Sequence, residues 1–196
     1  EGMIAAINFE YAQLDGDDFN STIGSGEENG YADILKTSGR VGLYYGLEDW
    51  IDYDLILRLK GRMTSISTGD NEYLPIAEKL FLGGIGSVRG YNPYSLAPFN
   101  DEDDITSGLA GGQHRASTSV EASIPLSEAA KMRLAFFYDY GMIGQDSFNE
   151  ITRSSTGVVV EWQSGFGPIN LVFAYPIDEE AHDQTAVFEF SMGTRF

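Results

Sequence analysis

Alternation of apolar and polar residues is the feature that most constrains how this chain can fold. Between residues 55 and 63, apolar side chains occupy one set of alternate positions, and mostly charged side chains occupy the other. Successive residues of a β-strand point to opposite faces, so the pattern predicts strands with one apolar and one polar face. It predicts about eight strands, over residues 3–14, 33–47, 52–67, 113–125, 131–143, 153–164, 167–177 and 185–196.

The connections between these strands alternate in length. Short ones lie near residues 48–51, 125–130 and 164–167, and longer, mostly polar ones cover 15–30, 71–112, 144–152 and 178–184. Short turns at one end and long loops at the other are typical of an up-and-down antiparallel barrel in an outer membrane. Eight strands are also enough to close a small barrel. The sequence therefore predicts an all-β, closed or nearly closed transmembrane β-barrel.

A soluble eight-stranded barrel of the lipocalin type would have the same strand count. The polar faces carry both signs of charge, which suits either a barrel interior or a soluble exterior. The aromatic residues favour the membrane barrel, because several fall at or near the short-turn end, as in an interfacial girdle. They are Trp50, Trp162, Phe166 and Phe196. The side chains expected to face lipid are Leu57, Leu59, Val120, Phe136, Trp162, Phe188 and Phe190.

Composition excludes several classes of function. With 12 basic and 30 acidic residues, the net charge of −18 argues against a nucleic-acid partner. The chain has no cysteine and only His114 and His182, so neither a metal site nor a histidine-assisted nucleophile is expected. The acids 101–104 lack EF-hand spacing, and no phosphate-binding loop with a following helix is present. We expect no catalytic residues and no cofactor.

The first residues, EGMIAAINFEY, read like the middle of a strand. They have no basic n-region and turn polar at once, so they do not form a signal peptide. We therefore expect the chain to begin inside a longer protein.

One irregular stretch, FLGGIGSVRGYNPYSLAP, places an arginine in a glycine-rich loop after a strand. Its residues Val88, Arg89, Gly90 and Tyr91 resemble the VRG[FY] motif of the Omp85 superfamily. The later segments SVEASIPL, RLAFFYDYGMI, GVVVEWQSGFGPINLVFAYPI and FEFSMGTRF resemble successive barrel strands of its BamA-like branch, in the same order. The resemblance covers residues 81–196, and residues 1–67 fit preceding strands by pattern alone.

The resemblance implies a sixteen-stranded barrel in the Gram-negative outer membrane, preceded by periplasmic POTRA domains. Residues 1–196 would then be a single barrel domain, the carboxy-terminal half, with 71–112 as a long extracellular loop. The implied function is assembly and insertion of outer-membrane β-barrel proteins, without enzymatic chemistry. The implied partners are the lipid bilayer, unfolded client proteins, and other subunits bound through the missing periplasmic domains. A secretion or TamA-like translocation pore and a passive structural barrel are the alternatives.

Two sets of residues follow as candidate functional positions. Strand parity places Glu121 and Asp139 on inward faces of adjacent strands, so Arg89 is expected to fold back and pair with both carboxylates. At the end of the chain, Phe188, Phe190 and Phe196 share one strand face. The resemblance implies that the terminal aromatic is read by the assembly machinery. Gly193 is expected to weaken or kink this last strand, which supplies an edge to which a client strand can add.

Overall fold

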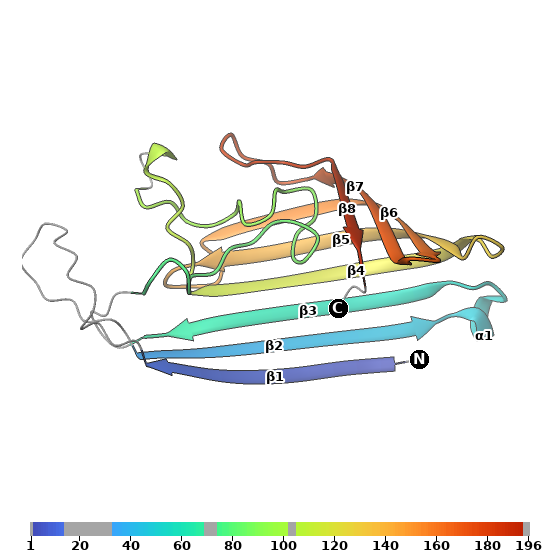
Figure 1. Ribbon diagram of the computed structural model, residues 1–196, viewed down its shortest axis with the longest axis horizontal. Helices are drawn as coiled ribbons and strands as arrows, with labels where there is room; N and C mark the ends of the chain where they lie inside the picture. The colour runs from blue at the N-terminus through green and yellow to red at the C-terminus, as the bar shows by residue number, and fades with distance from the viewer. Residues whose placement is uncertain (1, 14–32, 69–73, 102–104, 194–196) are drawn as a thin grey trace, which may run out of the picture.

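The computed structural model describes residues 2–13, 33–68, 74–101 and 105–193. One antiparallel sheet dominates it (Figure 1). Its eight strands are β1 (Gly2–Gln13), β2 (Asp33–Gly46), β3 (Ile56–Ser67), β4 (His114–Ser127), β5 (Met132–Gly144), β6 (Ile151–Ser164), β7 (Gly167–Pro176) and β8 (Phe188–Met192). The predicted eight up-and-down strands are confirmed. A short helix, α1 (Glu48–Ile51), occupies the predicted turn before β3, and a 3-10 turn covers Ile105–Ser107.

Each strand pairs with its neighbours in the chain, in the order β1 to β8. Among the described residues, β1 pairs only with β2 and β8 only with β7, so the sheet is open. The expectation of a closed or nearly closed barrel is therefore wrong for this chain. The physical reason lies on the concave side, which holds a backbone segment of residues 74–98. A closed eight-stranded barrel has room inside for side chains but not for an additional loop.

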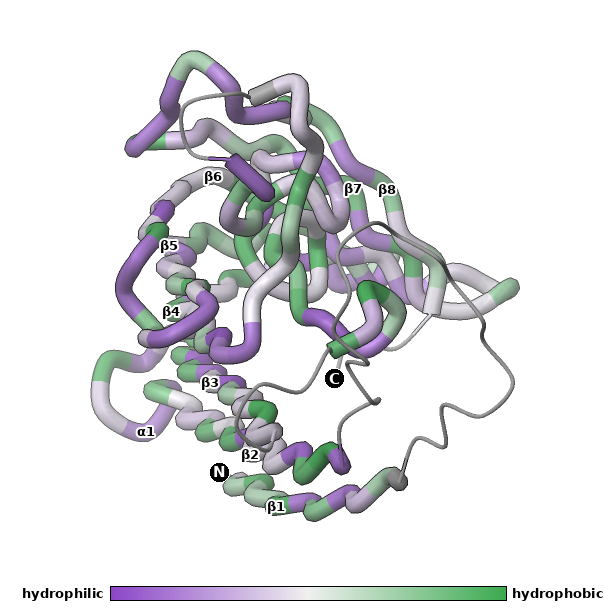
Figure 2. Tube along the Cα trace, turned by 90° about the vertical axis from the view of Figure 1, so that its left-hand side faces the viewer, coloured by the Kyte–Doolittle hydropathy of each residue, from purple (hydrophilic) through white to green (hydrophobic). Residues whose placement is uncertain are grey.

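Figure 2 shows hydrophilic and hydrophobic residues alternating along the strands. Successive side chains of a strand point to opposite faces, so this alternation gives the sheet two different faces. On the convex face the seven predicted lipid-facing residues are all exposed, from Leu57 at 39% to Phe188 at 54%. At the short-turn end, Trp50 and Phe166 are also exposed, and Phe196 lies outside the described residues. None of the described helices is long and apolar enough to cross a membrane.

The concave face carries the buried residues in two clusters. The larger one joins residues of the irregular segment to β2, β3 and β5, and consists of Ile34, Ile66, Leu74, Leu80, Leu82, Val88, Tyr91, Leu96, Ala97 and Ile143. The smaller one lies on β5, β6 and β7, and consists of Ala135, Phe137, Val159, Val172 and Ala174. The segment between β3 and β4 therefore packs inside the curved sheet, and its apolar residues supply much of the core.

Candidate functional site

Residues 81–98, here called the motif loop, make a compact turn against the inside of the sheet. Leu82 and Leu96 exchange backbone hydrogen bonds, and the Gly84 N–H donates to the Tyr91 carbonyl at 2.8 Å. Gly83 has a φ of +106°, and a Cβ at that position would lie 2.2 Å from the Asn92 carbonyl oxygen. Only glycine fits such a close approach in the left-handed region. The glycines thus fold the loop tightly enough to enter the concave side.

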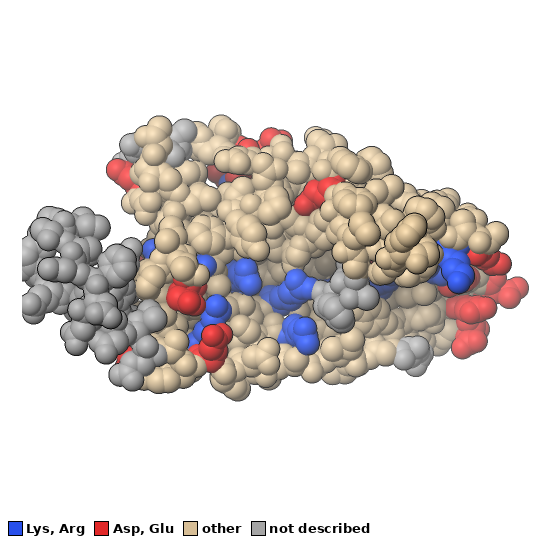
Figure 3. Space-filling model, in the orientation of Figure 1, with Lys and Arg blue, Asp and Glu red and all other residues tan. Residues whose placement is uncertain are grey.

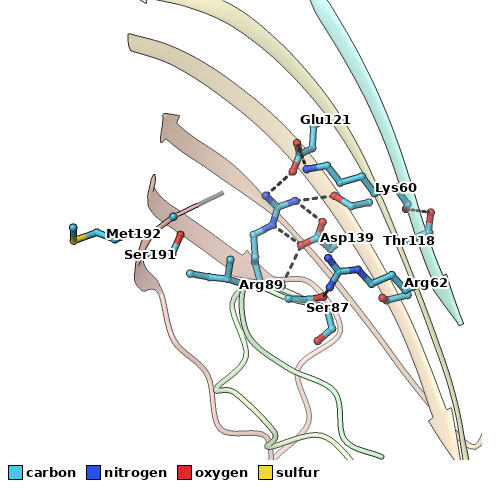
Figure 4. Close-up of a pocket in the computed structure, with 14 residues that line it drawn as sticks. Lys60, Arg62, Ser87, Arg89, Thr118, Glu121, Asp139, Ser191 and Met192 are labelled. Carbon is cyan, nitrogen blue, oxygen red and sulfur yellow. Dashed lines mark hydrogen bonds and ion pairs between the residues drawn. The ribbon is translucent and has the colours of Figure 1, made fainter. Parts of the chain in front are cut away.

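The loop carries Arg89 to the inner wall, where its side chain is 4% exposed. Its Nε and Nη2 donate to the two carboxylate oxygens of Asp139 at 2.7 and 2.6 Å. Its Nη1 donates to Glu121 Oε1 at 2.8 Å. The structure thus brings together the three residues that the sequence singled out, from the loop, β4 and β5 (Figure 4).

Two further contacts hold the guanidinium in place. Its Nη2 also donates to Ser119 Oγ at 2.8 Å, and its plane lies over the Phe137 ring, 3.6 Å from the ring centroid. An arginine stacked on an aromatic face gains a cation–π attraction in addition to its hydrogen bonds. Neither partner was identified from the sequence. Strand parity could have found both, because Ser119 and Phe137 share the inward faces of Glu121 and Asp139.

Arg89 belongs to a larger network of buried and partly buried charges. Glu121 also contacts Lys60 at 3.1 Å and Arg58 at 3.3 Å, and Arg58 makes a two-pronged contact with Glu161 at 2.5 and 2.7 Å. Three carboxylates therefore face three cations. Burying an unpaired charge is costly, so this balance is what permits the group to lie on the inner wall.

The other motif residues anchor the loop toward the end of the sheet. Val88 and Tyr91 are fully buried, and the Tyr91 hydroxyl donates to the backbone carbonyls of Ser154 and Asp178 at 3.3 and 3.0 Å. The Gly90 N–H lies 3.3 Å from Glu189 Oε2 on β8. The Gly90 carbonyl also accepts from the Ala186 N–H at 2.9 Å. These contacts join the loop to the segment that leads into β8, which the sequence analysis did not foresee.

The terminal residues lie on the last edge of the sheet. Phe188 and Phe190 point outward and are about half exposed, and the rings of Phe188 and Phe173 are 5.2 Å apart. Gly193 follows the last residue of β8 with a φ of +117°, which is consistent with the expected kink. Phe196 lies outside the described residues.

The described residues contain no group of three or more histidine, cysteine or acidic side chains that could hold a metal ion. His182 is exposed, whereas His114 is partly buried at the start of β4 and contacts Ser65 Oγ at 2.9 Å. The described site is a loop arginine held between two carboxylates on the inner face of the sheet.

Comparison with known proteins places this arrangement in a family. A profile of the Omp85 superfamily domain matches residues 1–196. The outer membrane protein assembly factor BamA of Neisseria meningitidis is 27% identical over 158 residues, covering 65% of this chain and 20% of that protein. The protein of the same name from Nitratidesulfovibrio vulgaris is 27% identical over 180 residues, covering 88% of this chain and 22% of that protein. The chain thus spans about a fifth of the length of these relatives.

A solved structure agrees in fold. The crystal structure of BamA from Haemophilus ducreyi lacking POTRA domains 1–3 superimposes with a TM-score of 0.76 at 20% sequence identity. The match covers 96% of this chain and 37% of that one. The open eight-stranded sheet therefore has the architecture of part of a larger barrel.

Proposed function

The chain belongs to the Omp85 superfamily, an outer-membrane family of Gram-negative bacteria, and we propose that it is the carboxy-terminal half of the barrel of an outer-membrane protein assembly factor. Residues 1–196 would form one barrel domain, and 71–112 would be an extracellular loop that folds inward. The proposed partners are the lipid bilayer, unfolded outer-membrane client proteins, and accessory subunits that bind periplasmic domains outside this chain. The chemistry is non-covalent.

We propose that the activity is strand templating at the β8 edge. The observation that carries this proposal is that β8 is short and that the described residues pair only one of its edges, through β7. An unpaired strand edge offers backbone N–H and C=O groups to an incoming strand, which adds by β-augmentation. Because β8 has only five residues and is followed by Gly193 in the left-handed region, its pairing can be exchanged at low cost.

Site-directed disulfide formation tests this proposal, because the chain has no native cysteine. In the whole protein, Ser191→Cys on β8 should cross-link to a cysteine in the terminal strand of a client stalled during insertion. The matched control is Ser38→Cys on β2, a strand paired on both sides, which should give no adduct. Equal cross-linking at both positions, or none at Ser191, would contradict templating at the β8 edge.

The same experiment separates the alternatives. A secretion or translocation pore would pass its cargo through the interior, so a cysteine at the concave Ser117 would react with cargo more than one at Ser191. A passive structural barrel would give no client adduct at any position. The outer membrane protein assembly factors among the relatives support an assembly function over both alternatives.

A further inference from the structure

The basic residues of this acidic chain are unevenly placed. Six of the 12 lie on the concave faces of three neighbouring strands, as the register and strand parity establish. We call this surface the basic wall; it consists of Lys36 and Arg40 on β2, Arg58, Lys60 and Arg62 on β3, and Arg115 on β4. Against these six, the concave faces of the described strands β2, β3 and β4 carry one acid, Glu121. Figure 3 shows Lys and Arg gathered along the hollow on this side of the molecule.

Part of this charge is already neutralised. Arg58 and Lys60 contact Glu121 and Glu161, in the network that also holds Arg89. Lys36 lies 3.7 Å from Glu78, in a partly exposed pair. These contacts pair three of the six cations with acids. The other three cations of the wall are all arginines.

The remaining arginines have no acidic partner within salt-bridge distance among the described residues. Arg40 and Arg62 stand directly opposite each other across β2 and β3, and both are exposed. Arg62 donates to the Gly86 carbonyl at 2.6 Å, and Arg115 donates to the Phe81 carbonyl at 2.9 Å. Like charges directly opposite in a sheet destabilise it. None of the acids in the described part of the chain forms a salt bridge with this pair.

Arg62 also borders the hollows of this face. One, of about 220 Å³, lies beside Arg89 and is lined by Lys60, Arg62, Ser117 and Ser119, together with the acids Glu121 and Asp139, which pair with Arg89 (Figure 4). A second, of about 330 Å³, is lined by Arg62, Arg115 and residues of the motif loop. The Arg62 guanidinium and neighbouring hydroxyl groups therefore border space that a ligand can enter.

We propose that the basic wall binds an extended acidic segment of polypeptide through its carboxylates. Guanidinium forks match carboxylates in two-pronged geometry. Lys36 and Arg40 are four residues apart on one strand, which corresponds to about 13 Å, longer than a single phosphate or other small anion can span. Lys60 and Arg62 are two residues apart, about 7 Å, the distance between alternate side chains of an extended peptide. The apolar convex face is the side that meets lipid, so a lipid headgroup has no access to the wall.

This inference does not depend on strand templating, because it concerns the inner wall and not the β8 edge. Its test is binding of a fluorescent peptide of alternating glutamate and serine to the whole protein in detergent micelles, followed by anisotropy. Arg40→Gln with Arg62→Gln should weaken binding about tenfold at low salt, the sum of two exposed ion pairs. The matched control, Lys79→Gln with Lys131→Gln, removes the same formal charge elsewhere and should leave binding unchanged.

Three outcomes would overturn the proposal. They are equal loss in both double variants, equal binding of a lysine–serine peptide, and displacement of the acidic peptide by inorganic phosphate at matched charge concentration. The last would indicate a small-anion site. Arg40→Lys with Arg62→Lys retains both charges and is the control for misfolding. It should keep most of the affinity for the acidic peptide.

A second measurement does not use a peptide. Since the chain has no cysteine, Ser117→Cys places a single thiol on the wall beside Arg62. A negatively charged thiol reagent should modify it faster than a positively charged reagent of similar size, because the local potential attracts anions. The acidic peptide should protect it. Equal rates for the two reagents, or no protection, would contradict an anion-attracting wall.

Discussion

The two halves of the sheet have the same alternating sequence pattern but use their concave faces differently. On β4 to β7, the motif loop covers the inner face, and charged groups such as Glu121 and Asp139 are almost fully buried in ion pairs with Arg89. On β2 and β3, the inner face is less covered, and Arg40 and Arg62 are exposed. Alternation thus decides which face a side chain occupies, but the covering segment decides whether it is buried.

The difference also explains where the stability of this chain should reside. The cost of removing a contact depends on whether solvent or another group can replace it. In the covered half, a lost partner leaves a dry, unpaired group. In the open half, water can take its place. Mutations in the two halves should therefore differ in cost even when the same type of residue is changed.

The largest expected effect is that of Arg89→Ala. The variant leaves Glu121 and Asp139 facing an empty position, and loss of one partner from a buried ion pair costs about 3–5 kcal/mol. The free energy of unfolding in detergent, measured by urea titration, should fall by that amount. Lys36→Ala, on the open half with a partially exposed ion pair, should cost less than about 1 kcal/mol. Similar losses in the two variants would remove the distinction between the halves.

A smaller effect is expected from trimming the apolar interior. Val159 on β6 is fully buried in the smaller core cluster, so Val159→Ala should lower the free energy of unfolding by about 2 kcal/mol. Val41 on β2 is 40% exposed on the convex face. Val41→Ala should therefore change the free energy of unfolding by less than about 0.5 kcal/mol. Parallel urea titrations check the difference, and a cost at Val41 equal to that at Val159 would contradict it.

The next smaller effect is expected from changing the backbone of the motif loop. Gly90 has a φ of +90°, and a Cβ there would lie 3.2 Å from the Ala174 Cβ on β7. Gly90→Ala should therefore lower the free energy of unfolding by about 1–2 kcal/mol. It should also increase hydrogen exchange at Ala186, whose N–H bonds to the Gly90 carbonyl. Gly165→Ala, with no atom within 4 Å of its added Cβ, is the control, and unchanged exchange at Ala186 would mean that the loop does not brace the approach to β8.

These contrasts mark how far the sequence could predict the molecule. Period-two alternation predicted all eight strands and both faces, because the direction of a side chain in a strand is a local property. Strand parity and the family resemblance together predicted that Arg89 pairs with Glu121 and Asp139. The start of β3 was placed four residues early, since 48–51 form α1 and the chain reaches the sheet only at Ile56.

The rest depended on long-range geometry. Whether β1 meets β8 depends on the curvature of the whole sheet and on the loop inside it. Neither property can be predicted from a short stretch of sequence. The pairing of Gly90 with Ala186 and the contact between Arg58 and Glu161 join residues about a hundred positions apart. Strand parity assigns Glu161 to the inner face of β6, but only the curvature of the sheet brings that face toward Arg58.

The smallest predicted effect concerns a contact that ties the two halves together at the short-turn end. Arg133 on β5 donates to Asp54, ahead of β3, at 2.5 and 3.1 Å, and to Ser123 Oγ on β4 at 3.0 Å. The Arg133 hydrogen bond holds the pKa of Asp54 below its ordinary value. A carboxyl whose pKa is lower in the folded state stabilises the fold above its unfolded pKa, about 3.9, and this stabilisation is lost as the pH falls through the lower folded value.

Asp54→Asn should therefore lower the free energy of unfolding slightly at pH 7, and the difference from the unsubstituted protein should shrink toward zero as the pH falls below about 4. The effect should be small and sensitive to salt, because the Asp54 side chain is 44% exposed. Asp49→Asn in α1, an exposed acid with no salt bridge among the described residues, is the control and should show no such convergence. A difference at Asp54 that stays constant from pH 7 to pH 3 would mean that packing, and not the ion pair, connects β3 to β5 at this end.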